Sequence, residues 1–214
     1  MYLLISDFLA FDNLKLRSTL ENNLNNISKM VYIASNFDDY ERNKKYSNKI
    51  KNILEEIVHN QIDLTIIDSR LTSNQMINAI DESDILFLAG GNTKQQFDFI
   101  KHYQIDSAII SKKNIIGMSA GAINLTTNIF LPSQFDQFVE KDISYKGLSI
   151  LDFVVYPHYE EIDNDMYNKI INKYDKSLIF FIKNSGFLYL RQENIIAYDC
   201  CLEGSLCSNI ISMH

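Results

Sequence analysis

The sequence is poor in cysteine, and its first residues are a poor match for a signal peptide. Its three cysteines, Cys200, Cys201 and Cys207, are an odd number crowded near the C-terminus, and they form no CxxC pair. This pattern predicts reduced thiols rather than a disulfide framework or a metal site. The first residues, MYLLISDFLAFDN, lack the basic start and the small-residue cleavage site of a signal peptide. We therefore expect a cytoplasmic protein without a bound metal.

Long apolar runs and basic clusters are also missing. The longest apolar runs have roughly six residues, whereas a membrane-spanning helix needs about 20. The net charge is −7, and adjacent basic residues occur as isolated doublets such as Lys44–Lys45. A negative chain without a basic patch is a poor match for a nucleic-acid groove. We expect neither a membrane nor a nucleic acid among its partners.

The composition is that of a globular domain. Hydrophobic residues make up 46% and charged residues 22% of the 214 residues, and a chain of this length can bury a three-layer core. No internal repeat, low-complexity linker or domain boundary is visible. We therefore predict one domain over residues 1–214, present as a monomer or a homodimer.

Short apolar runs alternate with helix-like segments in the first half of the chain. The apolar runs predict strands at Tyr2–Ser6, Met30–Ala34, Leu64–Ile67, Asp84–Leu88 and Asn114–Gly117. Apolar residues at helical spacing predict helices at Asn13–Asn25, Tyr40–Val58, Asn74–Asp81, Gln95–Lys101 and Ser107–Lys112. Buried strands alternating with amphipathic helices indicate parallel βαβ units.

The pattern changes after Phe130. A strand at Asp152–Tyr156 and a helix at Asn164–Tyr174 are followed by three strand-like runs, at Leu178–Ile182, Phe187–Leu190 and Asn194–Tyr198. The short spacing between the last two predicts a hairpin and therefore antiparallel pairing. We predict an α/β three-layer sandwich with a mostly parallel central sheet and antiparallel strands near the C-terminus.

Two of only seven glycines stand two positions either side of Ser119, in the stretch NIIGMSAGAINL. Gly117-Met118-Ser119-Ala120-Gly121 is a G-x-S-x-G motif between a predicted strand and a helix-compatible run, which is the context of a nucleophile elbow. Such a tight turn strains the serine backbone and requires small neighbours. The alternative, a turn whose glycines only allow close helix–sheet packing, stays open.

A second glycine-rich turn follows the preceding strand. Gly90 and Gly91 come directly after the run DILFLA, so two parallel strands would end in glycine-rich turns at the sheet edge where ligands bind. Uncovered backbone N–H groups of this turn, together with the Ala120 N–H, could form an oxyanion hole. We also expect Thr93 to cap the helix that follows.

A serine nucleophile needs a general base, and the chain has four histidines. His158 follows the run DFVVYP, which places it at the carboxyl end of a predicted strand, at the same edge as Ser119. His59 ends a predicted helix, His102 follows one, and His214 is the final residue. The geometry therefore favours His158 as the base.

The GGNT turn, the G-x-SAGA motif and the strand that ends in Pro157-His158 resemble the peptidase E family. These serine peptidases are α-aspartyl dipeptidases with cyanophycinases as relatives, and their fold is similar to that of class I glutamine amidotransferases, a flavodoxin-like arrangement. The resemblance implies a cytoplasmic, cofactor-free hydrolase of small peptides. It implies Ser119 as nucleophile, His158 as base, and Gly91 and Ala120 as the oxyanion hole. Residues expected beside the substrate are Gly90, Asn92 and Glu160.

The sequence departs from the family at the third catalytic position. Family members place an acidic residue after the strand that follows the histidine helix, and here Asn184 occupies the expected place. An amide oxygen can hold one histidine tautomer, but it stabilises an imidazolium less than a carboxylate does. Other carboxylates stay open as alternatives: Asp152, Glu193 and Asp199.

The substrate end is also altered. Aspartyl dipeptidases carry arginines after the histidine, whereas the segment from Glu160 to Lys176 has no arginine and begins with several acidic residues. Acidic side chains near His158 would repel a substrate aspartate and favour an amine. We therefore do not expect a preference for Asp-Xaa dipeptides.

Three functions compete. The leading hypothesis is a serine hydrolase that cleaves small peptides or amides by acyl transfer. An α/β-hydrolase esterase shares G-x-S-x-G, but that fold needs a late histidine, and here only His214 qualifies. A catalytically weak or inactive relative that acts as a binding or regulatory module is the third; Asn184 supports it, and Ser119 with His158 opposes it.

Overall fold

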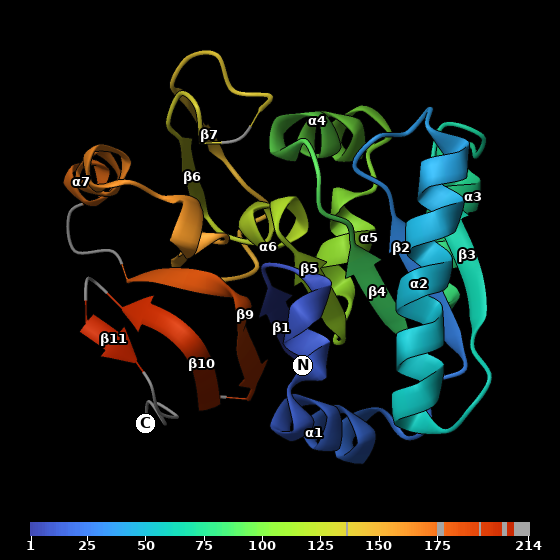
Figure 1. Ribbon diagram of the computed structural model, residues 1–214. Helices are drawn as coiled ribbons and strands as arrows, with labels where there is room; N and C mark the ends of the chain where they lie inside the picture. Colours follow the sequence, from blue (N-terminus) through green and yellow to red (C-terminus); the bar gives the residue numbers. More distant parts are fainter. Residues whose placement is uncertain (136, 175–177, 193, 203–204, 208–214) are drawn as a thin grey trace.

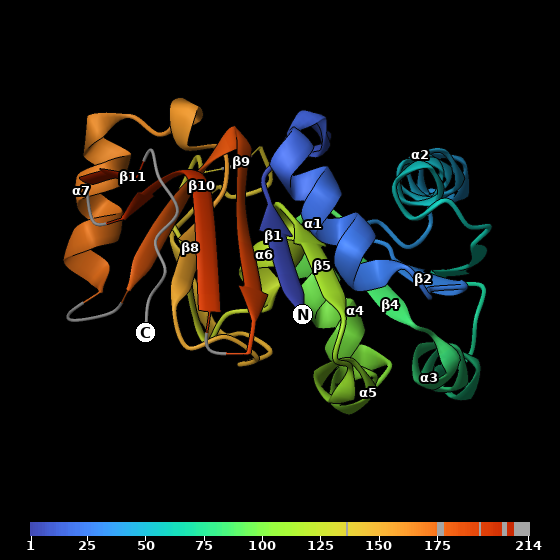
Figure 2. The same ribbon diagram turned by 90° about the horizontal axis from the view of Figure 1, so that it is seen from below.

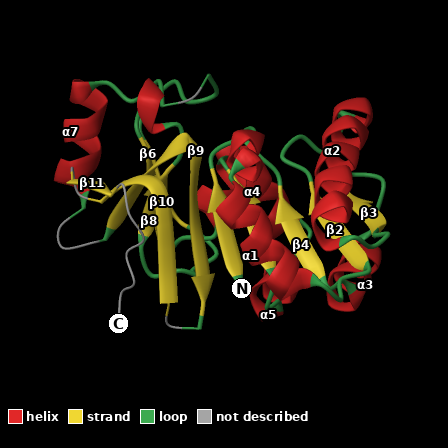
Figure 3. Cartoon of the chain, turned by 60° about the horizontal axis from the view of Figure 1, so that its bottom comes forward, coloured by secondary structure: helices red, strands yellow, loops and turns green. Residues whose placement is uncertain are grey.

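The computed structural model of the protein describes residues 1–135, 137–174, 178–192, 194–202 and 205–207. A β-sheet runs through the middle of the molecule, with helices packed against it (Figures 1 and 3). Within the described residues it has nine strands, in the order β11-β10-β9-β1-β5-β4-β2-β3, and β8 pairs with β9. Their bounds are β1 Tyr2–Ile5, β2 Lys29–Ile33, β3 Asp63–Ile67, β4 Ile85–Leu88, β5 Ile115–Met118, β8 Val154–Tyr156, β9 Ile179–Arg191, β10 Asn194–Leu202 and β11 Ser205–Cys207.

The sheet is parallel in its N-terminal part. Strands β1, β5, β4, β2 and β3 are parallel to one another, whereas β9 runs antiparallel to both β1 and β10. This arrangement confirms the predicted α/β fold with a mostly parallel sheet and antiparallel strands near the C-terminus. Because all five parallel strands point the same way, their carboxyl ends meet at one edge, where open α/β sheets bind ligands.

Helices cover both faces of the sheet (Figure 2). One face packs against α1 (Leu14–Leu24), α2 (Tyr40–Val58) and the 3-10 helix η1 (Phe8–Asp12). The opposite face packs against α3 (Ser73–Glu82), α4 (Thr93–His102), α5 (Asp106–Ser111) and α6 (Ala120–Asn124). Successive side chains of β1 alternate between the two cores, as a strand requires: Leu3 and Ile5 join one and Leu4 the other. Within the described ranges, no helix is long and apolar enough to cross a membrane.

Helix α2 forms where the sequence pattern predicts it. The Asp39 side chain accepts a hydrogen bond from the Arg42 N–H and caps the first turn. Ile50, Leu54 and other residues at helical spacing are buried against the sheet. The helix ends at His59, which adopts a left-handed conformation with φ 54°. The basic residues Arg42, Lys44, Lys45 and Lys49 of α2 are exposed.

Two features of the C-terminal half differ from the prediction. The runs Leu178–Ile182 and Phe187–Leu190 belong to one strand, β9. The polar residues between them are also part of this strand, which extends past the end of β1. The register between β9 and β10 shifts at this point. In addition, β6 (Asn128–Leu131) and β7 (Ile143–Lys146) form a separate two-stranded sheet, which the sequence analysis did not predict.

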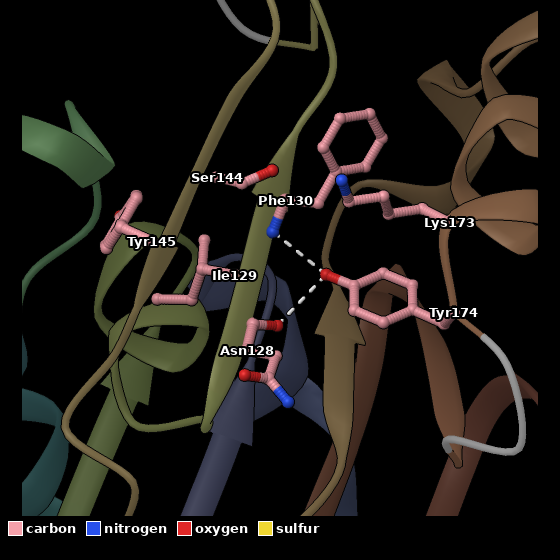
Figure 4. A pocket seen from close by; sticks show the side chains of 7 residues that line it. All are labelled: Asn128, Ile129, Phe130, Ser144, Tyr145, Lys173 and Tyr174. Atoms are coloured by element: carbon pink, nitrogen blue, oxygen red, sulfur yellow. Dashed lines mark hydrogen bonds between the residues drawn. The ribbon is translucent and has the colours of Figure 1, made fainter.

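Tyrosine hydroxyls connect this hairpin to β8 and to the segment after α7 (Asn164–Lys173); the second of these contacts is shown in Figure 4. The Tyr174 hydroxyl accepts a hydrogen bond from the Phe130 N–H at 2.9 Å and donates to the Asn128 carbonyl at 3.0 Å. The buried Tyr156 hydroxyl donates to the Phe130 carbonyl at 2.6 Å. Burial raises the pKa of both tyrosines, so both stay neutral donors. The contacts fix the hairpin whose connecting loop borders the candidate site.

Replacing Tyr174 with Phe should lower the free energy of unfolding by about 1–3 kcal/mol, because two backbone groups of β6 lose their partner. Tyr189→Phe is the matched control: the Tyr189 hydroxyl is buried and has no hydrogen-bond partner among the described residues, so its removal should be neutral or stabilising. Urea unfolding measures both variants. Equal losses in the two would contradict the structural role of Tyr174.

Candidate active site

Ser119 stands at the carboxyl edge of the sheet, in the turn between β5 and α6. Its backbone has φ 48° and ψ −110°, an uncommon conformation for a residue with a side chain. The Ser119 N–H donates to the Ile5 carbonyl at 2.8 Å, which ties the turn to the end of β1. The strain that a tight strand-to-helix turn imposes is therefore present at Ser119.

The glycines on either side make this turn possible. A Cβ at Gly121 would lie 2.2 Å from the Leu88 carbonyl oxygen, so α6 can approach the end of β4 only without a side chain there. A Cβ at Gly117 would lie 2.8 Å from the Leu125 side chain and 2.9 Å from the Ala122 backbone. The glycines of the motif therefore allow close helix–sheet packing, and the same packing holds the Ser119 turn in place.

His158 follows β8 and also has a left-handed backbone, with φ 58°. Its N–H donates to the Ser6 hydroxyl at 3.1 Å, and that hydroxyl donates to the Ile182 carbonyl at 2.8 Å. Ser6 is itself buried and directly follows β1. The ends of β1 and β8 are therefore joined to a residue within β9 through one serine hydroxyl, and this bridge fixes the position of the histidine.

The structure brings together three of the residues that the sequence analysis singled out. His158 Nε2 lies 3.0 Å from Ser119 Oγ, and His158 Nδ1 lies 2.6 Å from Asn184 Oδ1. Because an amide oxygen only accepts, Nδ1 carries the proton, and Nε2 is then free to accept from the serine hydroxyl. The Asn184 N–H donates to the Glu160 carboxylate at 3.0 Å, which holds Asn184 in turn.

The alternative carboxylates are placed elsewhere. The Asp199 carboxylate accepts a hydrogen bond from the Ser185 hydroxyl at 2.9 Å. Asp152 precedes β8, at the opposite end of that strand from His158. Glu193 lies outside the described residues, as does His214. A further carboxylate, Glu161, has an oxygen 4.0 Å from His158 Nδ1.

The glycine pair after β4 is fixed by a buried serine. The Ser35 hydroxyl donates to the Gly90 carbonyl at 2.6 Å. Gly91 has φ +134°, and a Cβ there would lie 2.2 Å from Ser35 Oγ, so this position requires glycine. The expectation that Thr93 caps α4 was wrong: the Asn92 side chain accepts from the Gln95 N–H, and α4 begins at Thr93. Asn92 is thus the cap of α4, and its predicted contact with substrate stays a prediction.

Two cavities meet at Ser119, and Gly91 and His158 also border both. The first, of about 360 Å³, is bordered by Phe135 and Phe138 from the loop that joins β6 and β7 and by the carboxylate residue Glu161. Glu160 does not border it. The second cavity, of about 330 Å³, is bordered by residues of η1, α2 and the Gly90–Gly91 turn.

Sequence reasoning missed Ser6, Ser35, Phe138 and the basic residues of α2. The serines carried a usable signal, because Ser6 is the last residue of one predicted strand and Ser35 directly follows another, and both strands end at the ligand-binding edge. The loop phenylalanine and the basic residues carried none, because their approach to Ser119 depends on how distant segments pack. Among the described residues, no group of three or more His, Cys, Asp or Glu side chains is arranged to hold a metal ion.

The chain is similar to known peptidases. A family model described as peptidase family S51 matches residues 3–198. A candidate peptidase E protein from Listeria monocytogenes EGD-e has a crystal structure with a TM-score of 0.72 and 23% identity, covering 92% of this chain and 97% of that chain. A peptidase from an acI-B1 Actinobacterium has a TM-score of 0.72 and 14% identity, covering 99% and 93%. No curated protein matches the sequence significantly.

Gly121→Ala should destabilise the fold by about 1–3 kcal/mol or more, because the backbone of β4 cannot retreat from the new methyl group. Gly90→Ala is the milder comparison, since its Cβ would meet the nearest atom, Ser119 Cβ, at 3.2 Å. Thermal unfolding ranks the two variants. A Gly121 variant as stable as the Gly90 variant would show that the close approach of α6 is not required.

Proposed function

Because the chain belongs to peptidase family S51 and is a serine peptidase, we propose that it hydrolyses small peptides, chiefly dipeptides, through a Ser119 acyl-enzyme. One observation carries the proposal: Ser119 Oγ, the imidazole of His158 and Asn184 Oδ1 form a continuous hydrogen-bonded relay beside two cavities. The relay has the donor–acceptor order that a serine nucleophile, its base and an orienting acceptor require.

In the first step, Ser119 Oγ attacks the scissile carbonyl carbon while His158 Nε2 takes its proton. The carbonyl oxygen becomes an oxyanion, and the N–H groups of Gly91 and Ala120 are the donors we assign to it. The N–H of Ala120, the first residue of α6, has no partner within the helix. The C–N bond then breaks, and His158 returns the proton to the leaving amine.

In the second step, a water molecule repeats the sequence. His158 Nε2 takes a proton from the water, the oxygen attacks the acyl carbon, and the bond to Ser119 Oγ breaks with the proton returned to the serine. The products are the free acid and the regenerated enzyme, so protons and bonds balance over the cycle without a further reactant.

Asn184 orients the imidazole but brings no charge to it. Its oxygen accepts from His158 Nδ1–H and thereby fixes the tautomer. Two carboxylates lie next to this pair. That of Glu160 accepts a hydrogen bond from the Asn184 N–H, and an oxygen of Glu161 lies 4.0 Å from His158 Nδ1. The side chain of Glu161 is 72% exposed, so water screens its attraction to an imidazolium. We expect a slower enzyme than one with a buried acid at position 184.

The first cavity favours an apolar residue with a free amine. Phe135 and Phe138 give it apolar walls, and Glu161 is its carboxylate. An N-terminal ammonium can pair with Glu161, whereas an aspartate side chain would be repelled. Cys201 is a buried free thiol, which suits a reducing compartment, and a cytoplasmic location is part of the proposal.

Ser119→Ala should lower kcat on any accepted dipeptide by about 10⁶, because the nucleophile is lost, while the unfolding curve stays that of the wild type. Ser144→Ala, at an exposed serine of β7, is the control and should keep full activity. Release of amino acids from an Ala-Leu, Lys-Leu and Asp-Leu panel is the measurement. Substantial hydrolysis by the Ser119 variant would assign the chemistry to another residue.

Asn184→Asp should raise kcat by a factor between about ten and 10⁴, because an isosteric carboxylate replaces the amide at the imidazole. The acidic limb of the pH–rate profile should move to higher pH, since the carboxylate keeps His158 protonated longer. Asn184→Ala should instead slow the enzyme, because the imidazole loses its orienting acceptor. If Asp and Ala at this position give the same rate and the same profile, Asn184 does not orient the histidine.

A further inference from the structure

The second cavity at Ser119 differs in charge from the first. It is bordered by η1 and α2 on the outside and by the Gly90–Gly91 turn next to Ser119. Arg42 and Lys49 of α2 border it, whereas the first cavity is bordered by Glu161. A positive cavity and a negative cavity therefore meet at the proposed nucleophile, on a chain whose net charge is −7.

The two cations are arranged on one side of α2. Arg42 and Lys49 are seven positions apart, which is two helical turns, so both side chains leave the same face. The Arg42 guanidinium carbon lies 5.7 Å from the centre of the Tyr46 ring, and Lys49 Nζ lies 4.1 Å from the centre of the Phe8 ring. Both rings also border the cavity. Aromatic faces thus hold the cations at the cavity wall.

Neither cation is neutralised by an ion pair with the residues that the structure describes. Among the described residues that border the cavity, the carboxylate belongs to Asp7, and it accepts a hydrogen bond from the Leu9 N–H at 3.1 Å as the cap of η1. Other basic side chains of α2 do not border the cavity; Lys45, for example, lies over the Tyr46 ring at 5.8 Å. The cavity wall therefore carries positive charge that can bind an anion.

We propose that Arg42 and Lys49 bind the free C-terminal carboxylate of the substrate, so that the enzyme selects short peptides with an open carboxyl end. The inference rests on the proposed function and defines its substrate class. A dipeptide has an ammonium and a carboxylate on opposite sides of its single peptide bond. With the scissile carbonyl at Ser119 and the ammonium at Glu161, the carboxylate lies in the second cavity.

An acidic side chain is the other source of a carboxylate. On the residue that forms the acyl-enzyme, such a side chain would share the first cavity with the ammonium and face Glu161, which repels it. The carboxylate across the scissile bond avoids that conflict and meets the cations instead. The charge distribution therefore favours the C-terminal carboxylate over an aspartate side chain.

Titration calorimetry on the Ser119→Ala protein separates the two sources, because binding is measured without turnover. Ala-Leu should bind at least ten-fold more tightly than Ala-Leu-amide. Adding Arg42→Gln and Lys49→Gln should reduce that ratio to near one, whereas adding Lys45→Gln should leave it unchanged. Asp-Leu-amide should bind no better than Ala-Leu-amide.

The inference is overturned if acid and amide bind equally, if no dipeptide binds, if the ratio survives loss of both cations, or if Asp-Leu-amide binds tightly through them. Failure of the proposed function is a separate result: the wild-type enzyme, with Ser119 intact, would bind the dipeptides with the same acid-to-amide ratio but release no amino acids from them.

Discussion

The site depends on the close approach of α6 to the ends of β4 and β5. Gly117 and Gly121 allow this contact, since a Cβ on either would overlap the backbone or side chains around it. The short turn that results forces Ser119 to φ 48° and ψ −110°. Strain of this kind persists only where the surroundings over-determine it, and here the Ile5 carbonyl holds the Ser119 N–H.

The other groups reach Ser119 because separate strands end at one edge. His158 follows β8, Ser6 follows β1, and Asn184 lies where β9 extends past the end of β1. Each is fixed by a hydrogen bond to a neighbour from a different strand, so the relay is assembled by the sheet rather than by one segment. The three side chains stay within hydrogen-bond distance because the strands that carry them belong to one rigid sheet.

The parallel half of the fold could be predicted from the local sequence, whereas the C-terminal half could be predicted only in part. Strands β1 to β5 were predicted because each is a buried apolar run between amphipathic helices. The β6–β7 hairpin was missed because its pairing and tyrosine contacts come from residues distant in sequence, such as Tyr174. The break predicted within β9 has a different cause: Lys183–Gly186 is a polar run, in which Asn184 contacts His158, and its polarity resembled that of a turn.

The residues of the site also fall into those that the sequence predicted and those that it did not. Ser119 was singled out by its glycines and Asn184 by the resemblance to the peptidase E family, and both predictions concern backbone position. The charge of the second cavity was not predictable, because Arg42 and Lys49 sit on an ordinary amphipathic helix, where basic residues usually face only solvent. Only in the folded chain do these two residues and the Gly90–Gly91 turn border the same cavity.

The most direct test of the central claim, that the strained Ser119 is an activated nucleophile paired with His158, is the mapping of a covalent adduct. The wild-type protein is treated with a fluorophosphonate, digested, and examined by mass spectrometry. The account predicts one phosphonyl group per chain, on the peptide that contains Ser119, and a strong loss of labelling in His158→Ala. Labelling of another residue, or no adduct at Ser119 in the folded wild-type protein, would contradict it.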